Sequence, residues 1–231
     1  KVAAGAKAEV LAEALRGAPA AGGVLELGTY CGYSALRAAL CLPGVRIVTL
    51  EVDPVHVVIA RHLIAFAGLA HVVDVWTGHG ALLIPRLSAR YRGLPGGPPF
   101  RAVFMDHRGS RYHEDLAALE QHGLLQPRAV VVADNVLQPG APLFLWRVTR
   151  SSAYSAEVVR LREFAMPTED WMAVVRLAPQ ARAEESPPEA LQLLHDEACA
   201  LRDRATLPGV VSFEDWAEFS GRMRRGLLQA G

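Results

Sequence analysis

A glycine-rich turn between an apolar run and a helical pattern constrains this chain more than any other feature. Residues 24–34 read VLELGTYCGYS, so a buried strand would end near Glu26 and a helix would begin just after Gly32. This is the order in which α/β folds build a nucleotide cradle at the edge of a sheet. We expect Gly28 and Gly32 to let the backbone approach a ligand, because a side chain at either position would occupy the ligand's space. A tight strand-to-helix turn that binds nothing would also use glycine.

The charge and spacing around this turn indicate which ligand it would hold. The glycines follow a G-x-x-x-G pattern, whereas a G-x-G-x-x-G pattern holds a pyrophosphate at a helix N-terminus. Glu26 stands just before the first glycine and favours a cationic ligand such as S-adenosylmethionine, which carries an ammonium and a sulfonium. Glu51 ends a second apolar run about 20 residues beyond the turn, where such domains place the acid that accepts from ribose hydroxyls. The alternative is a solvated glutamate at a strand end.

Strand-like and helix-like segments alternate up to residue 177, which is typical of a parallel sheet covered on both faces. We expect helices at 6–16, 33–41, 54–67, 81–91 and 115–122, and strands at 24–28, 46–51, 72–76, 102–105, 129–133, 156–162 and 172–177. The fold class is therefore α/β, with residues 1–177 forming one domain.

The character of the chain changes after residue 177. Residues 178–188 form a polar, proline-containing linker, and residues 189–231 form a helical C-terminal extension with helices at 189–204 and 213–229. Ser212, with Asp215 three residues later, is a variant of the capping box and would open the second of these helices. The extension could pack on the core, bind an intramolecular or intermolecular partner, or join another domain; its apolar positions favour packing.

Acidic and amide side chains follow two of the predicted strands. Asp106 follows the strand at 102–105, and Asp134 and Asn135 follow the strand at 129–133. Three hard oxygen donors at neighbouring strand ends suit Mg²⁺ completed by water and substrate. The alternative is that these residues cap the helices that follow each strand. A dinucleotide-dependent oxidoreductase would share the sheet and the acid after the second strand, but it needs closer glycines and has no use for the Asp134-Asn135 pair.

Composition excludes several classes of function. With 231 residues, 51% of them hydrophobic, the chain can bury one large core. A formal net charge of zero gives no basis for binding nucleic acid or a membrane surface, and no apolar run suits a bilayer span or a signal peptide. Cys31, Cys41 and Cys199 lack metal or disulfide spacing, which favours a reduced, cytoplasmic protein. The chain begins at Lys1 and not at methionine, as a fragment of a longer protein would.

Several motifs together strongly resemble the catechol O-methyltransferase family. They are ELGTYCGYS at 26–34, MDH at 105–107, RY at 111–112 and ADNVLQPGAP at 133–142. The resemblance runs from near residue 2 to about residue 177 and does not cover the C-terminal extension. It implies a seven-stranded Rossmann-like methyltransferase that uses S-adenosylmethionine and Mg²⁺ to methylate one hydroxyl of a catechol-type small molecule.

The resemblance also assigns roles to individual residues. Asp106, Asp134 and Asn135 would hold the metal, and Glu51 would hold the ribose. The other cofactor-binding residues would be Glu26, Gly28, Tyr30, Gly32, Tyr33, Ser34, Gly80, Ala81, His107 and Asp106. Glu163 would bind the second catechol hydroxyl, through an alignment that needs a one-residue deletion. Pro139 would wall the substrate slot, where Asn135 also lies.

The chain departs from the family directly after the first metal aspartate. The family reads Asp-His-Trp-Lys-Asp-Arg-Tyr, whereas this chain has Arg108 in place of the tryptophan gate and Gly109 in place of the general-base lysine. Lys1 and Lys7 are the only lysines, and neither can replace the lost one by a simple shift.

Three hypotheses follow from these departures. In the first, Mg²⁺ lowers the hydroxyl pKa enough for water, His107 or His113 to take the proton, and the enzyme is slower, because general-base assistance contributes about 10²–10⁴-fold. In the second, Arg108 recruits an acidic catechol-like substrate. In the third, the domain binds cofactor with weak or no catalysis and serves as an interaction module. The retained metal-ligand set favours the first two.

Overall fold

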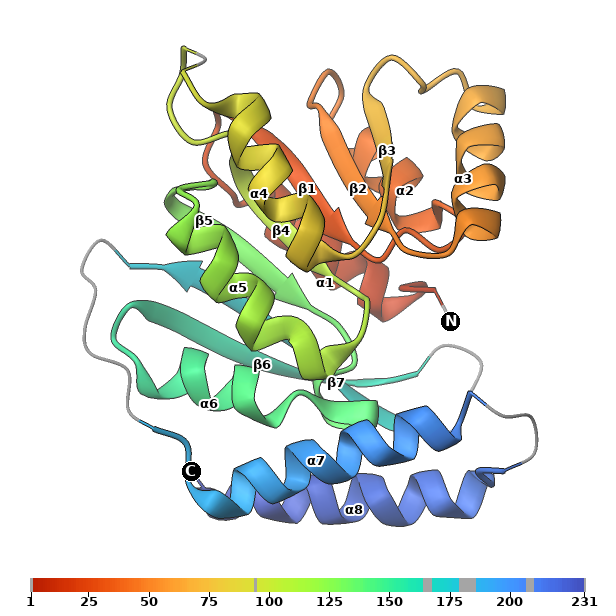
Figure 1. Cartoon of the computed structure of the whole chain (residues 1–231), viewed down its shortest axis with the longest axis vertical. Coiled ribbons are helices and arrows are strands. Elements are labelled where there is room, and N and C mark those ends of the chain that lie inside the picture. Colours follow the sequence, from red (N-terminus) through yellow and green to blue (C-terminus); the bar gives the residue numbers. More distant parts are fainter. Residues whose placement is uncertain (1, 94, 164–167, 179–185, 207–209, 231) are drawn as a thin grey trace.

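The computed structural model describes residues 2–93, 95–163, 168–178, 186–206 and 210–230. A seven-stranded sheet with the order β3-β2-β1-β4-β5-β7-β6 forms its centre (Figure 1). The strands are β1 (Gly23–Leu27), β2 (Ile47–Glu51), β3 (Val73–Thr77), β4 (Phe100–Met105), β5 (Leu125–Ala133), β6 (Tyr154–Arg162) and β7 (Glu169–Leu177). β7 runs antiparallel to both of its neighbours, and the other pairs are parallel. The predicted Rossmann-like α/β fold is confirmed.

Alternate side chains of each strand face two separate cores. Along β4, Val103 and Met105 pack with helices α4 (Gly80–Tyr91), α5 (Tyr112–Gln121) and α6 (Pro142–Arg150). Ala102 and Phe104 pack on the other face, with helices α1 (Ala6–Arg16), α2 (Tyr33–Cys41) and α3 (Pro54–Phe66). Every residue of β4 is buried, as expected for a central strand covered on both faces.

The sequence analysis missed three elements. Two of them lie between β5 and β6: a π-helical turn η2 (Val136–Gly140) and helix α6. The third is a 3₁₀ turn η1 (Gly109–Arg111), which lies between β4 and α5. Pro142 stands at the first turn of α6, where its fixed φ and missing N–H are harmless. The same signal at Pro54 did predict α3.

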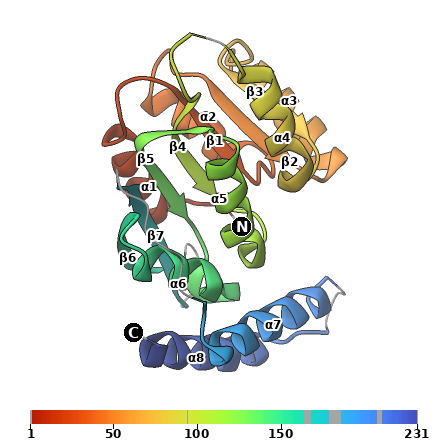
Figure 2. The same cartoon turned by 60° about the vertical axis from the view of Figure 1, so that its left-hand side comes forward.

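The C-terminal extension consists of two helices that lie side by side, α7 (Glu189–Arg204) and α8 (Phe213–Ala230) (Figures 1 and 2). Both helices and the Ser212 cap are confirmed, because the Asp215 amide donates to Ser212 Oγ at 3.1 Å and Asp215 Oδ2 accepts from the Ser212 amide at 2.7 Å. Phe219 and Met223 are fully buried in the same core as α4, α5 and α6. The extension therefore packs on the core. The division into domain, linker and extension stays a prediction, since residues 179–185 of the linker lie outside the described residues.

No helix among the described residues is both long and apolar enough to cross a membrane. The three cysteines, all of them described, are free and partly buried.

Candidate functional site

A cavity of about 920 Å³ opens at the carboxyl ends of β1, β2 and β4. This is the edge where an open α/β sheet binds its ligands. Of the predicted cofactor residues, the cavity is lined by Gly28, Tyr30, Tyr33, Ser34, Glu51, Gly80, Ala81, Asp106 and His107. Arg108 lines it as well, whereas Glu26 and Gly32 lie behind its wall. The structure thus brings most of the predicted cofactor residues around one space.

Backbone amides hold Glu51 at the end of β2. Its Oε2 accepts from the Tyr30 amide at 2.8 Å, and its Oε1 accepts from the amides of Val52 and Asp53 at 2.9 Å. The residue is only 9% exposed, so it is not the solvated strand-end glutamate of the alternative reading. Three fixed donors orient the carboxylate toward the cavity, which suits an acceptor for hydroxyl groups.

The glycines of the turn are needed for a reason that differs from the predicted one. A Cβ on Gly28 would meet the Asp106 carbonyl oxygen at 2.6 Å, and a Cβ on Gly32 would meet the Ala60 side chain at 3.4 Å. Both glycines have positive φ, 99° and 86°. The close neighbours are therefore the backbone after β4 and helix α3. The expectation that a side chain would occupy the ligand's space stays a prediction; in the structure, the glycines allow the turn to pack.

Glu26 is a buried acid next to the cavity wall, 2% exposed. Burial raises the pKa of its carboxyl to about 7, against the opposing hydrogen bonds from Ser34 and Thr49. An ammonium group at this point would lower that pKa and stabilise the carboxylate, which fits the cationic ligand that the sequence predicts.

His107 is held by an acid from the following helix. Its Nε2 lies 2.7 Å from Asp115 Oδ2, and Nδ1 is buried with no partner among the described residues. The Asp115 carboxylate thereby orients the His107 ring. Asp115 also crowds Gly80, where a Cβ would meet Asp115 Oδ1 at 2.9 Å. Asp115 therefore fixes two of the predicted cofactor residues at once.

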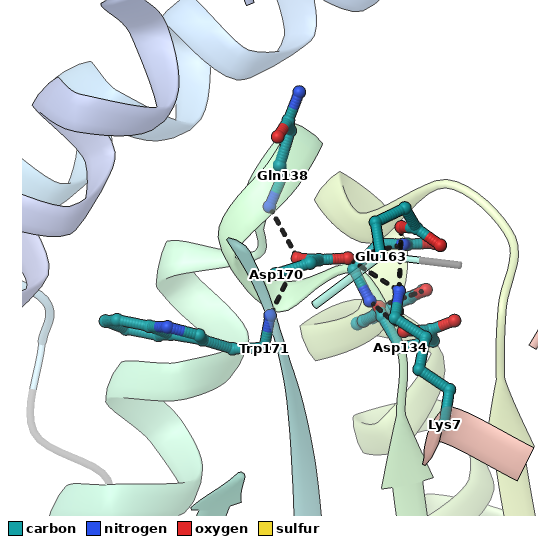
Figure 3. Close-up of polar contacts among 8 residues, drawn as sticks. Lys7, Asp134, Gln138, Glu163, Asp170 and Trp171 are labelled. Carbon is teal, nitrogen blue, oxygen red and sulfur yellow. Dashed lines mark hydrogen bonds and ion pairs between the residues drawn. The ribbon is translucent and has the colours of Figure 1, made fainter. Parts of the chain in front are cut away.

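Lys7 reaches two of the predicted metal and substrate residues, Asp134 and Glu163, and also Asp170 (Figure 3). Its ammonium is 2.7 Å from Asp134 Oδ1, 2.7 Å from Asp170 Oδ2 and 3.0 Å from Glu163 Oε2, and the residue is 1% exposed. Burial by itself lowers the pKa of Lys7, but the carboxylates of Asp134 and Asp170 more than reverse this and raise it. The lysine is a permanent cation, and it ties α1 to β5 and β7.

The next question is whether Asp106, Asp134 and Asn135 could hold a metal ion beside these contacts. The described part of the chain holds no group of three His, Cys, Asp or Glu side chains that could bind a metal, but the predicted set includes an amide, Asn135. The helix-cap alternative is not supported: Asp134 Oδ1 accepts from the Asn135 amide at 2.8 Å, and Asn135 precedes η2 without a capping bond.

The negative charge of the crowded carboxylates favours a divalent cation at this place. The Lys7 ammonium contacts the carboxylates of Asp134, Glu163 and Asp170, and its positive charge also acts on Asp106. Burial, together with the negative charge of Asp134, raises the pKa of Asp106 well above its ordinary value. A second cation would relieve this repulsion, and carboxylate and amide oxygens are the donors that Mg²⁺ prefers. The residues present fit the ion.

The predicted substrate residues lie beside this cluster. Asn135 has a left-handed φ of 57°, and its Nδ2 donates to Asp170 Oδ2 at 2.7 Å. Pro139 belongs to the η2 turn. Within the described residues, Asn135, Pro139, Asp134 and Glu163 do not line the large cavity, whereas Asp106 and Arg108 do.

The two residues that break the family pattern are both tied to the C-terminal part of the chain. Arg108 donates to Asp203 of α7 at 2.6 Å. A Cβ on Gly109 would meet the Gly140 carbonyl oxygen at 2.7 Å, and a Cβ on Gly140 would meet Met223 Cε of α8 at 2.6 Å. The η1 turn can therefore approach η2 because position 109 is glycine, and Met223 of α8 packs against Gly140.

Sequence reasoning missed Lys7 and the residues of α7 that line the cavity. Lys7, Leu11 and Leu15 share one buried stripe of α1, so a lysine on an apolar stripe was the available signal. His195, Cys199 and Arg202 of α7 line the cavity and gave no motif. His113, a candidate base, lines a separate cavity of about 250 Å³.

Comparison with known proteins identifies relatives for most of the chain. Residues 8–168 match the family described as O-methyltransferase. Catechol O-methyltransferase from Bos taurus is 43% identical over 132 residues, which is 57% of this chain and 47% of that protein. Transmembrane O-methyltransferase from Homo sapiens is 45% identical over 124 residues, 53% of this chain and 41% of that protein. The chain spans about half the length of the curated relatives it matches.

Solved structures share the fold. The O-methyltransferase TomG from Streptomyces achromogenes, which is involved in tomaymycin synthesis and was solved with SAM, is 26% identical with a TM-score of 0.64, over 77% of this chain and 82% of that one. The O-methyltransferase from Bacillus cereus, solved with SAH, has a TM-score of 0.63 over 77% of this chain and 82% of that one. Its 24% identity shows the fold alone.

Proposed function

This chain belongs to the O-methyltransferase family, and we propose that it transfers a methyl group from S-adenosylmethionine to one hydroxyl of a catechol-type acceptor held on Mg²⁺. The observation that carries the proposal is the cavity that Glu51, at the end of β2, and Asp106, at the end of β4, line together on either side of β1. A solved relative, TomG, was crystallised with SAM, and its fold covers most of this chain.

The cofactor would lie between the β1 turn and α4. Glu51 would accept from the ribose hydroxyls, Glu26 would face the ammonium, and Gly80 and Ala81 would lie near the adenine. His107, held by Asp115, would lie against the adenosine. Tyr30, Tyr33 and Ser34 would line the methionine end.

The acceptor would lie on the side of Asp106. When bound, Mg²⁺ would supply a Lewis acid that lowers the pKa of the attacking hydroxyl. Asp106, Asp134 and Asn135 would hold the ion. Lys7 and the Asn135 amide both bond to Asp134 Oδ1, so they fix the orientation of that carboxylate.

The remaining roles concern the acceptor and its proton. Glu163 would bind the second hydroxyl, and Pro139 would form one wall. Water, or His107 with its ring oriented by Asp115, would accept the hydroxyl proton. Loss of the family lysine predicts a slower reaction, by about 10²–10⁴-fold.

A second candidate function is cofactor binding with weak or no catalysis, as an interaction module. The observation that favours it is the contact at Gly109, where the Gly140 carbonyl leaves no room for the lost lysine. An exposed helix pair, α7 and α8, would then be the surface that such a module presents.

The test is methyl transfer from labelled S-adenosylmethionine to catechol, with Mg²⁺ or with a chelator, across neutral and alkaline pH. We expect chelator-sensitive turnover that rises with pH. Asp106→Asn should lower the rate at least about 100-fold, while Asp196→Asn, the same change at an exposed position of α7, should not. Binding of S-adenosylhomocysteine by calorimetry, with no turnover for any catechol, would instead support the binding-only function.

A further inference from the structure

Helix α7 forms one wall of the cofactor cavity. His195, Cys199 and Arg202 line the cavity and follow the i, i+4, i+7 spacing of a single helix face. Ala198 and Leu201, on an adjacent face, are buried in the main core. Packing therefore holds the helix in place, and it fixes the backbone from which the cavity-facing side chains extend. None of these residues falls in the segment 8–168 that matches the family.

Arg202 differs from the other arginines around this wall. Arg108 is paired with Asp203 at 2.6 Å, and Arg111 is paired with Glu114 at 3.0 Å. The guanidinium of Arg202 has no ion pair or hydrogen bond with any described residue, although the side chain is partly buried and lines the cavity. A partly desolvated guanidinium without a partner is unfavourable, and its planar donors match a carboxylate in a bidentate contact.

The position of Arg202 points to the acceptor end of the cavity. The residue that follows it, Asp203, accepts from Arg108 at 2.6 Å, and Arg108 stands two residues after Asp106. This end of α7 therefore lies beside the segment that begins with Asp106, whereas Glu51 and Gly80 line the part assigned to the nucleoside.

We propose that Arg202 binds a carboxylate on the methyl acceptor, so that the preferred acceptor is an acidic catechol. This inference rests on the proposed function and deepens it. The predicted role of Arg108 as the anion-binding residue passes to Arg202, because Arg108 is already paired with Asp203. An anionic group also needs a cation here, since the cavity carries the carboxylates of Asp106, Glu114 and Asp115.

The experiment compares a charged and a neutral acceptor by calorimetry, without turnover. Catechol and 3,4-dihydroxybenzoate are titrated into the chain saturated with S-adenosylhomocysteine and Mg²⁺. Arg202→Met should weaken 3,4-dihydroxybenzoate by about 10–100-fold and catechol by less than about 3-fold, as expected for loss of one charge-assisted pair. Arg202→Lys should fall between the two. Arg204→Met, which removes the same charge from an exposed position of α7, should change neither affinity.

The outcomes separate the inference from the function on which it rests. Equal binding of the two acceptors by the unmodified chain, or equal weakening of both by Arg202→Met, would overturn the role of Arg202 and leave the methyltransferase proposal standing. Weaker binding of S-adenosylhomocysteine alone would place Arg202 on the cofactor carboxylate instead, and would overturn the inference. Failure of the unmodified chain to bind either acceptor, with S-adenosylhomocysteine bound normally, would overturn the catechol proposal itself.

Discussion

The cofactor end and the acceptor end of the cavity hold their charges in different ways. At the cofactor end, Glu51 is held by backbone amides of neighbouring turns, including its own. At the acceptor end, Asp134, Glu163 and Asp170 are held by Lys7, which lies more than 120 residues away from each of them in sequence. The first arrangement needs only a local turn. The second needs α1, β5 and β7 to be in place together.

The difference also concerns how far each end depends on distant parts of the chain. A carboxylate held by backbone amides depends little on the side chains around it, as at Glu51. The acceptor end depends on packing between distant elements, and there Arg108 and Gly109 contact α7 and η2 in place of the family residues. The C-terminal helices and the altered motif therefore form one packing unit.

The largest effect is expected when the acceptor end loses its cation. Lys7→Met would remove the ammonium that the buried carboxylates of Asp134 and Asp170 contact at 2.7 Å, and the free energy of unfolding should fall by about 3–5 kcal/mol. Denaturant unfolding followed by circular dichroism measures this. Arg16→Met removes a cation from the exposed end of the same helix and should change stability by less than about 0.5 kcal/mol. A loss no larger than that of Arg16→Met would mean that the ammonium does not hold the acceptor end.

At the cofactor end, the matching change should act on binding and not on folding. Glu51→Gln keeps the shape of the side chain but removes its charge, so S-adenosylmethionine should bind about 10–100-fold more weakly, which is about 1.5–3 kcal/mol. Calorimetry measures the affinity, and the melting temperature of the free protein should stay nearly constant. If Glu51→Gln destabilised the free protein as much as Lys7→Met, the contrast between the two ends would fail.

The same contrast separates what could be predicted from the sequence from what could not. The turn at Gly28 and the acid at Glu51 lie within one strand-turn-helix-strand unit, so their spacing alone predicted a shared site. The cluster around Lys7 could not be found by spacing, because its members come from distant elements. Lys7 lies in α1, and the acids lie just after β5, just after β6 and at the start of β7.

Packing between turns also explains why positions 28 and 109 are glycine. From the sequence, Gly28 and Gly109 were explained by the ligand and by a missing side chain, respectively. In the structure, both are explained by a backbone carbonyl less than 3 Å from where their Cβ atoms would lie, that of Asp106 for Gly28 and that of Gly140 for Gly109. No single-sequence pattern reports a contact between two turns that are 31 residues apart (109 and 140).

A moderate effect is expected from adding a side chain where η1 meets η2. Gly109→Ala should lower stability by about 1–3 kcal/mol, because the neighbour that must move is the backbone carbonyl of Gly140. Gly109→Lys should be destabilised at least as much and should not restore a fast reaction. Gly17→Ala is the control, since its Cβ would meet only ordinary contacts and its φ is −77°. Equal stability of the two alanine variants would remove the packing explanation for Gly109.

The smallest effect is expected on the pH dependence of stability, from the contact between His113 of α5 and His195 of α7. The rings of His113 and His195 meet edge to face at 5.3 Å, and burial lowers the pKa of each below 6.5, helped by the neighbouring imidazole for His113 and opposed by Asp196 for His195. The other charged groups that act on one or both rings are Glu114, Arg111, Arg108 and Arg147. The unfolded chain therefore binds more protons than the folded chain in mild acid.

The sign of the pH dependence follows from this difference. The stability from these neutral imidazoles is fully present above about pH 6.5 and is lost as the pH falls below that value toward the lowered folded pKa. The loss between about pH 8 and about pH 5.5 should stay under about 1 kcal/mol, because solvent screens a partly exposed pair. His195→Gln should flatten this part of the profile, whereas His62→Gln, an exposed histidine on α3, should leave it unchanged. If His195→Gln kept the full dependence of stability on pH, protonation at the α5–α7 contact would not be its cause. The C-terminal helices would then be held by Phe219, Met223 and their apolar neighbours alone.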